Sequence, residues 1–125
     1  MLTSRRLVIV AILVLLAISA VLRCWHLGQP PDYMFDEVYY AKDAKAIVDG
    51  RAGPDKTKNS WEPGDLVSWP HPDVGKFAIA VGILLAGDRS VGWRLPSVVA
   101  GLVLLGCVYP LARGLGLPVR WALVA

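Results

Sequence analysis

The sequence predicts an all-α integral membrane protein, and two observations carry that prediction. Of its 125 residues, 55% are hydrophobic and only 18% are charged, and the mean hydropathy is +0.51. A soluble domain of this length would carry more charge around its core. Two apolar runs without charge, residues 7–22 and 95–112, are close in length to a membrane-crossing helix, which needs about 20 residues.

The first run, LVIVAILVLLAISAVL at 7–22, follows Arg5 and Arg6. A pair of arginines before an apolar run is also typical of a signal peptide. Residues 17–19, Ala-Ile-Ser, would form a poor cleavage site, so we expect an uncleaved first span. The second run, LPSVVAGLVLLGCVYPLA at 95–112, predicts a second span. A third apolar segment starts at Trp121 and continues to Ala125, which predicts the beginning of a third span and a chain that is the N-terminal part of a longer protein.

Charge placement predicts the orientation of these spans. Residues 1–6 and 113–120 carry arginine and no acid, whereas all ten Asp and Glu residues lie between Arg23 and Arg94. The positive-inside rule therefore places 1–6 and 113–120 in the cytoplasm and 23–94 outside, in the periplasm of a bacterium. We expect a multi-pass protein of the plasma (inner) membrane, in contact with the lipid bilayer. The net charge of +3 comes from the flanks and indicates no nucleic-acid partner.

The external region, 23–94, divides into three parts. Val38, Ala41, Ala44 and Val48 recur at helical steps, which predicts an amphipathic surface helix over 36–49 that stops at Gly50. Residues 50–70 are rich in Gly, Pro and charge and predict an irregular loop. A short apolar helix over 74–87 is too short to cross a membrane and is expected to lie at the interface.

The external region also places a carboxylate pair, Asp36 and Glu37, near three cations at the same membrane face: Arg23, Lys76 and Arg94. Such a set suits one task, in which a phosphate-bearing lipid is held while a hydroxyl is deprotonated. Each residue has a simpler interpretation. The acids could cap the surface helix and complement its dipole, and the cations could be interface anchors.

Other ligand types leave little signal in the sequence. No cofactor is certain; a divalent metal held by His71 with a carboxylate stays an alternative, because spacing alone does not complete a metal site. Cys24 lies at a membrane boundary and Cys107 inside a span, so we expect no disulfide between them.

Three motifs occur in a fixed order: LRCWHLGQPPDYMFDEVYYAKDA, then HPDVGK, then GWRLPSVVAG. In this order they resemble the N-terminal part of the protein O-mannosyltransferases, most closely the bacterial type. These are polyprenyl-phosphate-mannose-dependent glycosyltransferases of the GT-C membrane class. The resemblance covers most of residues 20–115 and implies a GT-C-type N-terminal region.

The resemblance implies specific roles at matching positions. Asp36 corresponds to the proposed catalytic carboxylate that faces the acceptor hydroxyl, with Glu37 beside it. Arg23 and Arg94 correspond to arginines that end the first span and open the second, and His71 to Lys76 correspond to an HPPxGK motif that places the lysine near the lipid phosphate. Asp73 stands where the family has proline, and could pair with Lys76 or mark a different substrate.

The resemblance thus implies an inverting transfer of mannose, or a related sugar, from a polyprenyl-phosphate carrier to a Ser or Thr hydroxyl of a protein. Two alternatives stay open: a GT-C transferase that modifies a glycolipid with an aminoarabinose-type sugar, and a small non-catalytic membrane-anchored interaction protein. We expect the 125-residue chain alone to be inactive.

Overall fold

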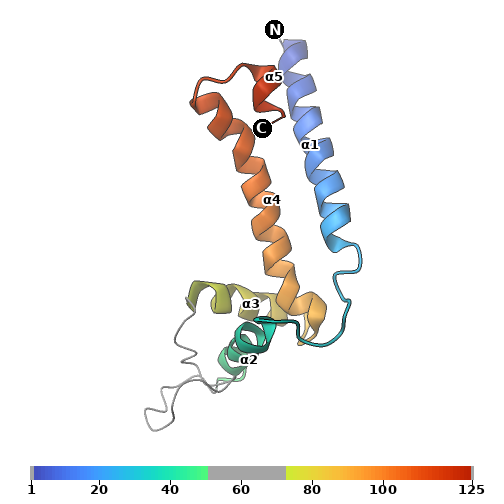
Figure 1. Cartoon of the computed structure of the whole chain (residues 1–125), viewed down its shortest axis with the longest axis vertical. Helices are drawn as coiled ribbons and strands as arrows, with labels where there is room; N and C mark the ends of the chain where they lie inside the picture. The colour runs from blue at the N-terminus through green and yellow to red at the C-terminus, as the bar shows by residue number, and fades with distance from the viewer. Residues whose placement is uncertain (1, 51–72, 125) are drawn as a thin grey trace. The chain divides into compact units, whose positions relative to one another are not determined.

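The computed structural model describes residues 2–50 and 73–124, and every element in these ranges is a helix (Figure 1). The helices are α1 (Leu2–Cys24), α2 (Glu37–Val48), α3 (Asp73–Ala86), α4 (Ser90–Gly114) and α5 (Val119–Ala122). The predicted all-α class is confirmed for this part of the chain. The described residues divide into two units, Met1–Trp25 with Ser97–Ala125 and His26–Pro96.

The first unit holds most of the apolar surface. Arg5–Cys24 of α1 and the whole of α4 are each long and apolar enough to cross a membrane. Side chains such as Leu7, Leu22 and Leu104 are largely exposed, which costs little when the surrounding medium is hydrocarbon. The two helices therefore support the prediction of a membrane protein, and α5 is too short to test the predicted third span.

The second unit contains α2, α3 and the first turns of α4. Ala44, Ala80 and Ile83 are buried together, with Ile47, Val48 and Ile79 packed around them. Small residues at this contact let the α2 and α3 backbones approach closely, so the two short helices share one core. The predicted surface helix thus buries a face against α3.

Glycine permits an even closer contact between α3 and α4. A side-chain carbon on Gly82 would lie 2.2 Å from the carbonyl oxygen of Gly92 and 2.8 Å from the ring of Pro96. Proline has no N–H and cannot donate to the carbonyl four residues earlier, here that of Gly92. The α3 backbone packs directly against this carbonyl, and α4 begins at Ser90, before the predicted start at Leu95.

Candidate active site

Asp36 and Glu37 are adjacent in sequence but have different surroundings. Asp36 occupies the N-cap position of α2, where its backbone oxygen accepts hydrogen bonds of 3.0 Å from the amides of Tyr39 and Tyr40. Its side chain makes no capping hydrogen bond. Within residues 2–50 and 73–124 the Asp36 carboxylate has no hydrogen-bond or ion-pair partner, and it is exposed.

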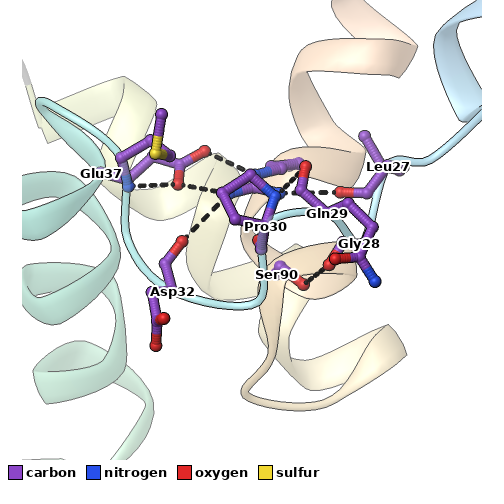
Figure 2. Close-up of polar contacts among 9 residues, drawn as sticks. Leu27, Gly28, Gln29, Pro30, Asp32, Glu37 and Ser90 are labelled. Atoms are coloured by element: carbon purple, nitrogen blue, oxygen red, sulfur yellow. Dashed lines mark hydrogen bonds and ion pairs between the residues drawn. The ribbon is translucent and has the colours of Figure 1, made fainter.

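Glu37 is bound on both carboxylate oxygens (Figure 2). Oε1 accepts a 2.7 Å hydrogen bond from Nε of Arg94, and Oε2 accepts one of 2.8 Å from Nη2. Oε2 also accepts the backbone N–H of Met34 at 2.9 Å. The Arg94 hydrogen bonds hold the pKa of Glu37 below its usual range, burial opposes them, and the Met34 amide assists. Glu37 is therefore a charged, fixed carboxylate.

Arg94 directs its remaining N–H groups to one loop. Nη1 donates to the carbonyl oxygens of Leu27, Gln29 and Pro30, each at 3.0 Å. Nη2 donates to the carbonyl of Asp32 at 3.2 Å (Figure 2). Because a guanidinium has five N–H donors in a fixed plane, every donor of Arg94 faces a protein acceptor.

The result is a clamp that joins α4 and the start of α2 to the loop that connects α1 with α2. The hydroxyl of Ser90 adds a 2.9 Å hydrogen bond to the carbonyl of Gly28. Loop carbonyls have no helical or sheet partner and need one when partly buried, so Arg94 and Ser90 fix the segment that leads to Asp36.

An aromatic pair lies beside this clamp. The rings of Tyr33 and Trp93 have centroids 4.7 Å apart, a favourable distance for tilted rings. The buried Trp93 N–H has no hydrogen-bond partner of acceptable geometry within the described part of the chain, although it is near enough to Glu37 to help lower the pKa of that carboxyl. Burial, followed by the negative charge of Asp88, raises the pKa of Tyr33.

Phe35 directly precedes the acid pair and has a backbone conformation that residues other than glycine rarely adopt. Its φ is 47°, in the left-handed region that is uncommon for a bulky residue. The side chain is also 89% exposed. Backbone strain of this kind concentrates at functional sites, and here it occurs at the residue directly before Asp36.

Lys76 is inside the protein and not at its surface. Its side chain is 2% exposed, and Nζ lies 3.1 Å from Oδ2 of Asp43, which is 0% exposed. Asp73, at 71% exposure, lies 3.4 Å from the same ammonium. The carboxylate that replaces the family's proline thus does pair with Lys76.

Asp43 is a site residue that sequence reasoning missed. In the helix it is about 200° around the axis from Ala41, outside the apolar stripe, so the periodicity that predicts the helix does not identify it. The available signal was an acid among Ala41, Ala44 and Ala46, since short side chains leave room for a neighbouring helix to cover it.

The predicted site residues also include Arg23 and His71. Arg23 belongs to the first unit, where its Nε donates a 3.1 Å hydrogen bond to the hydroxyl of Ser19. His71 lies outside the described residues. In the described ranges no group of three or more His, Cys, Asp or Glu side chains could hold a metal ion.

Comparison with known proteins gives this geometry a family context. The chain is 35% identical over 103 residues to a polyprenol-phosphate-mannose–protein mannosyltransferase of Mycolicibacterium smegmatis, a match that covers 80% of this chain and 19% of the relative. It is 33% identical over 100 residues to the protein of the same name from Mycobacterium tuberculosis, covering 77% of this chain and 18% of the relative.

These matches confirm the resemblance to protein mannosyltransferases. The chain spans about a fifth of the length of the curated relatives it matches. No family model matches the chain, and no solved structure matches it significantly.

Proposed function

We propose that this chain is the part of a membrane mannosyltransferase that binds a polyprenyl-phosphate sugar and deprotonates the acceptor. The substrates would be polyprenyl-phosphate-mannose and a Ser or Thr hydroxyl of a protein. The observation that carries the proposal is the 33–35% identity, over about 80% of the chain, to proteins named for that reaction.

Asp36 is the proposed general base. A hydroxyl is a poor nucleophile, and a carboxylate within hydrogen-bond reach can accept its proton as the new glycosidic bond forms. The exposure of Asp36 and its freedom from described partners leave both oxygens available for this task. Glu37, fixed by Arg94, positions the start of α2 and does not take the proton.

The leaving group requires positive charge. As mannose departs, the electrons of the broken C–O bond go to the polyprenyl phosphate, which becomes more negative, and attack from the opposite side inverts the anomeric carbon. Fixed cations at such a position are worth about 3 kcal/mol per donor. Lys76 and Arg94 are both held by carboxylates, so in this proposal they support the fold of the site, and Arg23 contacts the phosphate.

The proposed orientation follows from charge. With residues 1–6 and 113–120 in the cytoplasm, Asp36, Glu37 and Lys76 lie on the external side of the membrane, where a lipid carrier would deliver the sugar. His71, in the HPDVGK motif, is kept as a donor-binding candidate.

The proposal is tested by sugar transfer in membranes that contain the polypeptide of the complete open reading frame around this chain. Radiolabelled mannose should pass from polyprenyl-phosphate-mannose to a Ser/Thr peptide, with inverted anomeric configuration. Label that appears only in a glycolipid, or transfer only from a lipid-linked aminoarabinose, would replace this proposal with the glycolipid-modifying alternative.

A further inference from the structure

We infer that Arg23, Ser19 and Gly101 form a niche for the phosphate group of a lipid, and that Gly101 is the positioning residue of this niche. All three residues belong to the first unit. The lipid's identity as a sugar carrier rests on the proposed function, whereas the recognition of phosphate rests on the contacts below.

The guanidinium of Arg23 lies against the backbone of α4 at Gly101. A side-chain carbon at Gly101 would stand 2.8 Å from Nη1 and 2.9 Å from Cζ, closer than real contacts allow. The absence of a side chain at this position is therefore what admits the guanidinium.

Ser19 determines the direction of the arginine. Side chains on a helix lean toward its N-terminus, and Ser19 is one turn before Arg23 in that direction. The 3.1 Å hydrogen bond from Nε to Ser19 Oγ holds the side chain back along α1. An ordinary interface anchor would extend the other way, toward the water.

A cation held back along an apolar helix needs a counter-charge, because an unpaired charge in the bilayer is costly. In the part of the chain that the structure describes, the η nitrogens of Arg23 have no acceptor. They present parallel N–H donors, the arrangement that binds two phosphate oxygens at once. A lipid phosphate is an anion of the right shape that is always present at a membrane surface.

Gly106 provides a matched control on the same helix. A side-chain carbon there would meet nothing within 4 Å, whereas at Gly101 it meets the far end of a flexible side chain. Leucine is a better helix former than glycine at both positions. Gly101→Leu should therefore displace Arg23 without unfolding the protein. Gly106→Leu should leave both the position of Arg23 and the fold unchanged.

The experiment measures binding of polyprenyl phosphate, and of the uncharged polyprenol of equal length, to the full chain in nanodiscs. Wild type and Gly106→Leu should prefer the phosphate, and Arg23→Ala and Gly101→Leu should lose that preference by roughly tenfold or more. Arg23→Ala/Gly101→Leu should be no weaker than either single variant, because both changes remove the same contact.

Two results would overturn the niche. One is an unchanged preference for the phosphate in Arg23→Ala. The other is an equal loss of that preference in Gly101→Leu and Gly106→Leu, with circular dichroism showing that both variants are folded. Competition by phosphatidylglycerol at equal strength would support the niche and assign it to bulk phospholipid. Phosphate-selective binding together with absent mannose transfer by the complete polypeptide would leave the niche standing and refute the proposed function alone.

Discussion

The bidentate pair between Glu37 and Arg94 holds two charged side chains in one fixed geometry. Each oxygen of the carboxylate and each donor of the guanidinium already has a protein partner. Arg94 can fill this role because it is planar, and lysine, a point charge, cannot reproduce the fork.

Arg94→Lys should therefore lower activity and stability although the positive charge is kept. Loss of the paired hydrogen bonds should reduce the free energy of unfolding by about 2 kcal/mol, measured as a lower thermal midpoint in detergent. Arg89→Lys, on an exposed residue that precedes α4, is the control. Equal midpoints for Arg94→Lys and wild type would contradict the clamp.

Glu37 also makes the stability of the second unit depend on pH. Its folded pKa is lowered from 4.5, so its stabilisation is fully present above the unfolded value and is lost as pH falls through the folded value. The thermal midpoint of wild type should drop below about pH 4.5 more steeply than that of Glu37→Gln. Parallel pH profiles for the two proteins would show that Glu37 makes no such contribution.

At the scale of elements, α2 and α3 are joined by the buried pair of Asp43 and Lys76. Removing one partner of a buried ion pair costs about 3–5 kcal/mol, whereas replacing both with apolar residues is often neutral. Lys76→Met should thus destabilise strongly and Asp43→Leu/Lys76→Met should recover much of the loss in thermal unfolding. A double variant no better than Lys76→Met would indicate that Lys76 acts outside this pair.

The contact between α3 and α4 depends on Gly82. Gly82→Ala would place a methyl group against backbone atoms that cannot move aside, and overpacking of this kind costs about 1–3 kcal/mol. Gly75→Ala, in the same helix, would meet only the Tyr40 ring at 3.5 Å and should keep the wild-type thermal midpoint. Equal midpoints for Gly75→Ala and Gly82→Ala would show that the close approach is unimportant.

The helices themselves could be predicted from sequence because their signals are local. Uncharged runs identify α1 and α4, and apolar residues at helical steps identify α2. The pairing of Lys76 with Asp73 could be predicted because the two are three positions apart. The pairing of Glu37 with Arg94 could not, since Arg94 lies 57 positions from Glu37 and no periodic pattern connects them. Asp43 was not identified because helical periodicity describes one helix alone and does not show that α3 brings Lys76 to it.

At the scale of the whole molecule, the account requires the carboxylates to be outside the cytoplasm. An alkaline phosphatase fused after Gly50 should be active in a bacterial host, because it would be exported, and a fusion after Gly116 should be inactive. Both glycines are exposed and follow the ends of helices, so a fusion there should leave the preceding helices intact. The reverse pattern of activity would overturn the orientation and the proposed site with it.

The most direct test of the central claim is the rate of mannose transfer by the complete polypeptide with Asp36→Asn. The matched control is Asp32→Asn, since Asp32 is an exposed acid of the same loop whose backbone carbonyl, not its side chain, contacts Arg94. If Asp36 is the general base, Asp36→Asn should lose roughly a hundredfold or more in rate with unchanged donor binding, and Asp32→Asn should lose little. Near-normal transfer by Asp36→Asn would show that the proton goes to another group.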